Sequence, residues 1–115
     1  MQKKEEVKEA MFMGSSLNDL RKFPETVRGV MGAGLREAQK GGQPDIARPL
    51  PEFGTGVHEL RESYQKDAYR VVYWVQRIYL FVLHAFKKKS TEGKSIPKAD
   101  KETIKARLKA AQKEG

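Results

Sequence analysis

The sequence predicts an α+β domain, in which a small, mostly antiparallel sheet carries two N-terminal helices on one face and is followed by a basic C-terminal helix. Three observations support this fold class. Three consecutive runs rich in β-branched and aromatic residues are separated by short polar breaks. Helical periodicity precedes these runs, and a lysine-rich amphipathic segment follows them. With 115 residues and no internal repeat, we expect one domain over residues 1–115.

The N-terminal part is expected to form one strand and two helices. Residues 7–13 are largely apolar and end at Gly14, which is typical of a first strand. Ser16 can cap a short helix that Pro24 ends. A longer amphipathic helix then runs from Pro24 to Lys40 and stops at a glycine pair. Each of its three internal glycines weakens it by about 1 kcal/mol relative to alanine, unless close packing on a neighbour requires it.

The remaining elements follow from residue type and alternation. Residues 43–56 hold three prolines and two glycines, and we expect a loop there. Strands are predicted over 57–62, 68–75 and 78–86, with short hairpin turns between them. The last segment, 98–113, places its few apolar residues on one helical face among lysines.

The composition excludes several classes of site. The chain has no cysteine, so a disulfide scaffold, a thiolate nucleophile and a cysteine-ligated metal site are all excluded. Two histidines, His58 and His84, are too few to indicate a metal site, and no phosphate-binding loop or nucleophile elbow occurs. We therefore expect neither metal nor cofactor. No membrane span or signal peptide is apparent, which predicts a cytoplasmic protein without a membrane partner.

Basic charge is concentrated towards the C-terminus. The chain carries 23 basic and 15 acidic residues, a formal +8. Residues 84–115 contain ten Lys/Arg and four Asp/Glu, so most of the excess lies in the last 32 residues. Such a block indicates a polyanionic partner such as nucleic acid, or an acidic protein. A solvated basic helix without any partner explains it equally well.

Arg70 stands out because it lies within an otherwise apolar strand. A guanidinium at such a position must reach solvent, meet a carboxylate or serve a ligand phosphate. The simplest alternative is an ion pair with Glu59 or Glu62 across the hairpin, and the same alternative applies to Arg61.

Other candidates have equally plain structural explanations. His84 has the residue type for proton transfer, yet it can also be a hydrogen-bonded histidine of the core. Alternation within its strand places it on the same face as Leu80, Val82 and Phe86. The lysine run 87–89 can be a solvated strand end. The tyrosines and Trp74 are expected mainly to pack, although one or two could stack on nucleobases.

Short motifs in a fixed order extend over nearly the whole chain. They are Gly14-Ser15-Ser16, Asp19-Leu20, Phe23-Pro24, Ala38-Gln39, Pro49-Leu50, Phe53-Gly54, Glu59-Leu60-Arg61, Tyr69-Arg70-Val71-Val72-Tyr73, Leu83-His84-Ala85-Phe86, Lys87-Lys88-Lys89-Ser90, Pro97-Lys98-Ala99-Asp100 and Ile104-Lys105-Ala106-Arg107-Leu108. In this order and spacing the chain resembles the RelE/HigB toxins of bacterial toxin–antitoxin systems, in particular their phage-derived branch. It departs from them at Ile96, where a threonine is usual, so that Asp100 is expected to start the last helix. It also departs at Met11 to Met13, where a tryptophan is common.

This resemblance implies a RelE-like fold with a basic active face on the side of the sheet away from the two N-terminal helices. It implies a metal-independent messenger-RNA endoribonuclease that acts on ribosome-bound transcripts and inhibits translation. A cognate antitoxin, in this branch a helix-turn-helix DNA-binding protein, would silence it. The expected site comprises Arg70, Lys87, Lys88 and His84 for catalysis, and Arg61, Lys89, Lys94 and Lys98 for RNA binding.

Two other functions stay open. ParE-like relatives share the scaffold and inhibit DNA gyrase by protein–protein contact. An inactive phage remnant that binds only RNA or its antitoxin is the third hypothesis. The nuclease hypothesis depends on Arg70 and the lysines at residues 87–89 sharing one open surface.

Overall fold

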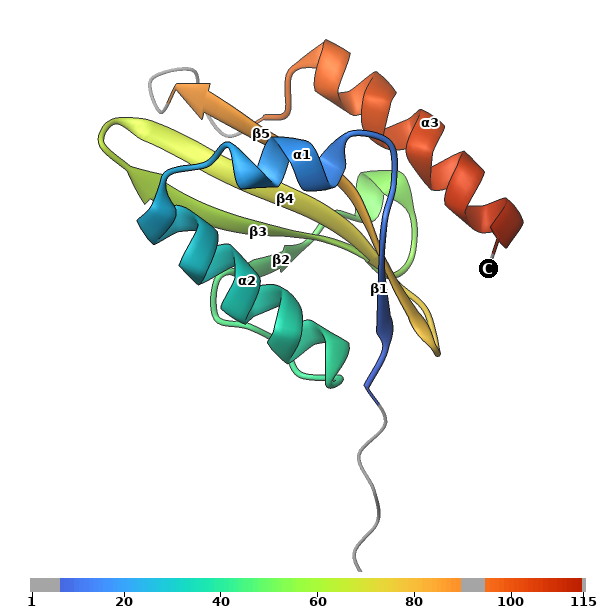
Figure 1. Ribbon diagram of the computed structural model, residues 1–115. Coiled ribbons are helices and arrows are strands. Elements are labelled where there is room, and N and C mark those ends of the chain that lie inside the picture. Colours follow the sequence, from blue (N-terminus) through green and yellow to red (C-terminus); the bar gives the residue numbers. More distant parts are fainter. Residues whose placement is uncertain (1–6, 90–94, 115) are drawn as a thin grey trace, which may run out of the picture.

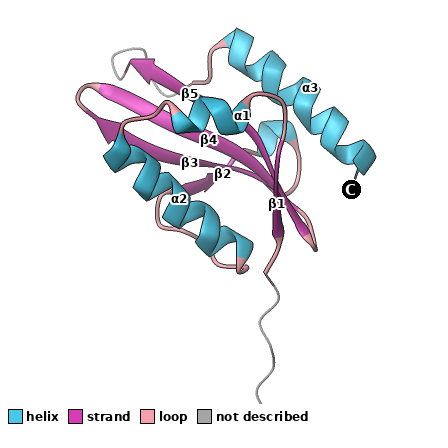
Figure 2. Ribbon diagram, in the orientation of Figure 1, coloured by secondary structure: helices cyan, strands magenta, loops and turns pink. Residues whose placement is uncertain are grey.

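The computed structural model describes residues 7–89 and 95–114 and has helices on both faces of one five-stranded sheet (Figures 1 and 2). The strand order is β1-β5-β4-β3-β2. The strands are β1 (Glu9–Phe12), β2 (Ala47–Pro49), β3 (Val57–Tyr64), β4 (Asp67–Val75) and β5 (Tyr79–Lys89). The helices are α1 (Ser16–Arg21), α2 (Glu25–Gln39), α3 (Lys98–Glu114) and the short 3-10 helix η1 (Pro51–Phe53). The predicted α+β class is confirmed.

Hairpins build most of the sheet. β2, β3, β4 and β5 are antiparallel neighbours, and only β1 runs parallel to its neighbour β5. The turn between β3 and β4 consists of Gln65 and Lys66, both with positive φ (47° and 72°), as a tight two-residue hairpin requires. The sheet is therefore mostly antiparallel, as alternation in the sequence predicts.

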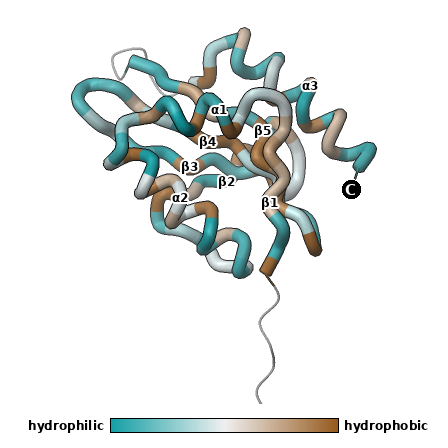
Figure 3. The backbone as a smooth tube through the Cα atoms, viewed as in Figure 1, coloured by the Kyte–Doolittle hydropathy of each residue, from teal (hydrophilic) through white to brown (hydrophobic). Residues whose placement is uncertain are grey.

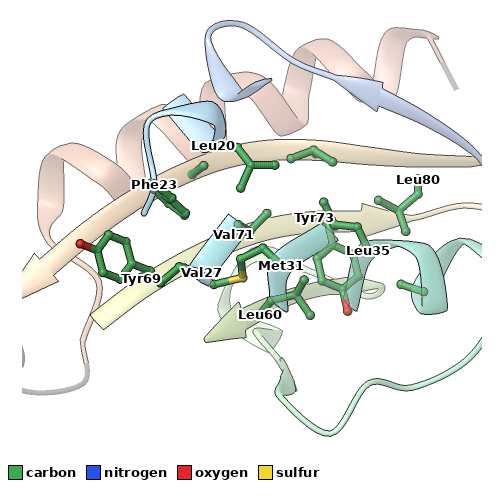
Figure 4. Close-up of a cluster of buried hydrophobic side chains, with 13 residues drawn as sticks. Leu20, Phe23, Val27, Met31, Leu35, Leu60, Tyr69, Val71, Tyr73 and Leu80 are labelled. Carbon is green, nitrogen blue, oxygen red and sulfur yellow. The ribbon is translucent and has the colours of Figure 1, made fainter. Parts of the chain in front are cut away.

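The first core layer lies between the sheet and the helices α1 and α2 (Figure 4). Val27, Met31 and Leu35 lie on the buried side of α2 and pack against Leu60, Val71 and other strand residues. Along α2 the residues alternate between hydrophilic and hydrophobic (Figure 3), which is the pattern of a helix with one buried side. We call this side of the sheet the α1/α2 face.

The second core layer lies on the opposite side, which we call the α3 face. There Ile104, Leu108 and Ala111 of α3 pack with Val72, Phe81 and other residues of the sheet. The helix is otherwise polar, and this narrow apolar stripe packs it against the sheet. Within the described residues, no helix has the length and apolar character needed to cross a membrane.

Several local predictions are wrong. Residues 43–56 are not only a loop, because they contain β2 and η1. Ser16 does not cap α1: its hydroxyl donates to the carbonyl of Val82 (3.1 Å) and so attaches the helix to β5. Helix α3 begins at Lys98, as the predicted segment 98–113 does, so Asp100 does not start it; Asp100 lies in the first turn and is bound by a side chain of β5.

Only one of the three glycines inside α2 has a packing role within this chain. A Cβ at Gly34 would lie 3.0 Å from Cδ1 of the buried Leu60, so this glycine allows α2 to approach β3 closely. A Cβ at Gly29 or Gly32 would meet nothing within 4 Å. Close packing therefore explains Gly34 and leaves the other two unexplained.

Candidate functional site

Three arginines surround one carboxylate on the α3 face. Arg61 of β3 lies directly opposite Arg70 of β4, and Glu59 lies opposite Arg48 of β2. Residues that face each other in antiparallel strands project on the same side, and Glu59, Arg61 and Arg70 alternate in register with Val57 and Val72 of the α3-face core. We call Arg48, Glu59, Arg61 and Arg70 the arginine cluster.

Glu59 and Arg70 form the buried part of the arginine cluster. Arg70 has no exposed surface, and its Nε lies 3.8 Å from Oε1 of Glu59. Burial raises the pKa of Glu59, and the charges of Arg70, Arg61 and Arg48 counteract this by favouring the carboxylate. Burial lowers the pKa of Arg70 while Glu59 opposes that change, and an arginine remains protonated in proteins. The ion pair expected between Arg70 and Glu59 is confirmed.

Arg48 and Arg61 form the accessible part of the arginine cluster. Arg48 is exposed and Arg61 is half-buried. Both line an open cavity of about 540 Å³ at the edge of the sheet, next to the start of β2, together with Asp45, Ile46, Glu62 and Ser63. Two guanidinium groups at the mouth of a polar cavity can bind phosphate oxygens with their planar N–H donors.

The lysines at the end of β5 do not form one cluster. The strand continues to Lys89, so its side chains alternate between the two faces. Lys88 follows Phe86 onto the α3 face, is buried and donates to the carbonyl of Ser95. Lys87 and Lys89 project on the α1/α2 face, where Nζ of Lys87 lies 3.8 Å from Oδ2 of Asp67. We expected Arg70 and all three lysines to share one surface. This prediction is wrong for Lys87 and Lys89, which lie on the other face of the sheet.

His84 does not share the face of Leu80 and Val82, contrary to what alternation in the sequence predicted. The pairing of β4 with β5 shifts between Val72 and Tyr73, and Leu83 is left without a partner in the register. This bulge reverses the alternation, because one extra residue is inserted in β5. Leu80 and Val82 stay on the α1/α2 face, whereas the ring of His84 stacks on Phe86 on the α3 face (4.9 Å between centroids).

Helix α3 engages both ring nitrogens of His84. Its Nε2 lies 2.7 Å from Oδ1 of Asp100, and its Nδ1 lies 3.4 Å from Nη1 of Arg107. Because a guanidinium only donates, Nδ1 accepts and Nε2 carries the proton. Arg107 also donates to the carbonyl of Leu83 and to the hydroxyl of Ser15. The arrangement attaches α3 to β5 and leaves neither nitrogen of His84 for a substrate.

The two remaining residues that were expected to bind RNA are Lys94 and Lys98. Lys98 is exposed at the first position of the helix. Lys94 lies outside the described residues. In the same region Nζ of Lys101 lies 3.3 Å from Oε2 of Glu52, an ion pair that joins α3 to η1. In the part of the chain that the structure describes, no group of three His, Asp or Glu residues could hold a metal ion.

Sequence reasoning missed Arg48 and the central position of Glu59. Arg48 lies in a segment whose prolines predicted only a loop, and nothing in the local sequence indicates that it pairs opposite Glu59. Glu59 was predicted as an ion-pair partner of Arg70, and the strand alternation already placed it on the same side as Arg61. Its position among three arginines depends on β2.

The chain is thus a small basic α+β protein with three arginines on one face of its sheet. Residues 18–109, most of the chain, match the model of the phage-derived Gp49-like protein family (DUF891). The chain belongs to that family, and it is a toxin-like protein of the RelE type. A comparison with curated proteins found none that matches.

Proposed function

We propose that this protein is a messenger-RNA endoribonuclease that inhibits translation, and that the arginine cluster is its active site. One observation supports this above all: on the face away from α1 and α2, the strand register places the accessible Arg48 and Arg61 beside Glu59, a carboxylate that is 5% exposed and whose pKa is raised. The family is RelE-like, and the net charge of +8 suits a polyanionic substrate.

The chemistry needs no metal ion. The 2′-hydroxyl of a ribose attacks the adjacent phosphorus, a 2′,3′-cyclic phosphate forms and the bond to the 5′-oxygen breaks. In the proposed reaction Glu59 accepts the proton of the 2′-hydroxyl, and water protonates the leaving 5′-oxygen. A carboxylate with a raised pKa is a stronger base than an ordinary one. Arg61 and Arg48 bind the phosphate oxygens and stabilise the charge that develops on them.

Arg70 has a positioning role in this proposal instead of the phosphate contact expected from the sequence. Its guanidinium has no exposed surface, so it acts through Glu59, which it holds at 3.8 Å. His84 has no proposed part in proton transfer because Asp100 and Arg107 engage its nitrogens. Lys88 is buried beside Ser95, and Lys98 is exposed at the start of α3, where it can contact the RNA backbone.

The ribosome and an antitoxin are the proposed partners. A site with two accessible arginines and one carboxylate cleaves RNA faster when the ribosome holds the RNA in a reactive geometry. We therefore expect the isolated protein to cleave free RNA slowly. An antitoxin with acidic groups would block the arginine cluster by charge complementarity.

The function is tested by inducing the protein without any antitoxin and mapping new transcript 5′ ends during the first minutes. We expect growth arrest, a rapid fall in protein synthesis and new 5′ ends within translated regions. Filamentation and DNA damage without new 5′ ends would indicate a gyrase inhibitor instead. Normal growth at high expression would indicate an inactive remnant.

The pH dependence of cleavage tests the role of Glu59. A protonated carboxyl cannot accept the 2′-hydroxyl proton, so the cleavage rate should rise with pH through the pKa of Glu59. Because burial raises that pKa, the midpoint of this rise should lie above the ordinary value of 4.5. Glu59→Gln should remove the rise and lower the rate by about 10²- to 10⁴-fold. Single-turnover cleavage of ribosome-bound RNA between pH 5 and 8 measures both.

Glu25→Gln is the matched control for this experiment. Glu25 is an exposed carboxylate at the start of α2, on the other side of the sheet, and it does not line the 540 Å³ cavity. The control should retain both the rate and the pH profile. An unchanged profile in Glu59→Gln would show that another group accepts the proton.

A further inference from the structure

A second cavity, on the α1/α2 face, is built from polar groups that the proposed nuclease does not use. It has a volume of about 240 Å³ and lies where α2 ends against β3 and β4. Its lining residues are Ala38, Gly41, Gly42, Gln43, Gly56, His58, Tyr73 and Val75. Gly41 has a φ of +90°, and a Cβ there would meet nothing within 4 Å. The space next to this glycine is therefore not filled by other protein atoms.

The hydroxyl of Tyr73 is the principal polar group of this cavity. The side chain is 1% exposed and belongs to the buried cluster under α2 (Figure 4). Its hydroxyl oxygen forms no hydrogen bond with a described residue and is not itself fully buried, so it is open to the cavity. Burial and the negative charge of Glu37 raise the pKa of Tyr73 to about 12, so the phenol stays protonated and neutral. Water or a ligand in the cavity must therefore supply the hydrogen bond of this hydroxyl.

The other groups around the cavity are mainly acceptors. The ring of His58 stacks on Tyr73, with 5.7 Å between centroids, and its Nδ1 lies 3.2 Å from the carbonyl oxygen of Gly56. A carbonyl only accepts, so Nδ1 donates and the Nε2 of the neutral ring is an acceptor. The C-terminal end of α2, at Gln39, adds the negative end of a helix dipole.

We propose that this cavity binds a small planar cation with several N–H donors, namely an alkylguanidinium group. Such a group donates to the hydroxyl oxygen of Tyr73 and to Nε2 of His58. The end of α2 and Glu37 favour its positive charge and disfavour an anion. The volume of the cavity suits a single side chain or a small molecule, and the arginine of a partner protein and a free alkylguanidine share this chemistry.

Ethylguanidinium and its uncharged counterpart ethylurea are the probes for this proposal. Titrations of the ¹⁵N-labelled full chain should show saturable shifts at Gly41, Gly42 and Gly56 with ethylguanidinium, and at least tenfold weaker binding of ethylurea. Tyr73→Phe removes only the hydroxyl and should weaken ethylguanidinium binding about tenfold or more. Because that hydroxyl has no partner among the described residues, the variant should keep the melting temperature of the parent.

Tyr69→Phe is the matched control, since Tyr69 belongs to the same buried cluster and does not line this cavity. It should bind ethylguanidinium as the parent does. Absence of saturable binding, equal binding of ethylurea, or unchanged binding by Tyr73→Phe would each overturn the proposal. A capped Gly-Arg-Gly peptide distinguishes the two sources: tighter binding than agmatine supports a protein partner, and weaker binding supports a free alkylguanidine.

Discussion

Replacing Arg61 by glutamine is expected to lower the rate of transcript cleavage by about 10²- to 10³-fold. This is the usual effect of removing one group that stabilises developing charge in a transition state. Arg61 is half-buried at the mouth of the 540 Å³ cavity, so glutamine keeps most of the side-chain packing and removes the charge. Single-turnover cleavage on purified ribosomes measures the effect, and a melting curve confirms that the variant is folded.

The control for this variant is Arg28→Gln. Arg28 is an exposed arginine of α2, on the other side of the sheet, so the two variants change the net charge equally. If cleavage depended only on net positive charge, both variants would lose activity to a similar extent. Equal loss in the two variants, or full activity in Arg61→Gln, would exclude the arginine cluster as the active site.

Replacing Arg70 by alanine is expected to have the largest effect on stability. The substitution leaves Glu59 as a buried carboxylate next to a cavity, and breaking a buried ion pair in this way costs about 3–5 kcal/mol. Chemical denaturation at neutral pH measures the loss. Because protonation of Glu59 relieves the buried charge, the deficit should shrink as the pH falls below the raised pKa of this group.

The double variant Arg70→Ala with Glu59→Gln separates the charge from the packing. Glutamine removes the buried negative charge, so the double variant should recover part of the stability that Arg70→Ala loses. The recovered part measures the cost of the uncompensated carboxylate. If Glu59→Gln gave no recovery at neutral pH, the role of Arg70 in holding Glu59 would be contradicted.

The strands and helices with strong local signals were predictable. β4 and β5 are long runs of β-branched and aromatic residues, and α2 shows clear helical periodicity, so each was expected near its observed position. β2 had no such signal. It has three residues, contains Pro49 and exists through its pairing with β3, so residues distant in sequence decide its presence.

The faces predicted for several site residues were wrong where they depend on the exact pairing of the strands. We expected β5 to end at Phe86 and treated the three lysines as one group, but the strand reaches Lys89 and separates Lys87 from Lys88. His84 changes face because of the bulge at Leu83, which the sequence does not mark. A shift of one residue moves every following side chain to the other face, so small errors in register move whole sites.

The amino-acid sequence by itself determined the α+β class, the basic character of the chain and the resemblance to RelE-type toxins, because composition, periodicity and motif order are local properties. Only the tertiary structure decided which cations share a face, that Arg70 is buried against Glu59, and that Arg48 joins them from β2. These features depend on strand order, register and burial. Such properties arise from contacts between segments far apart in the chain.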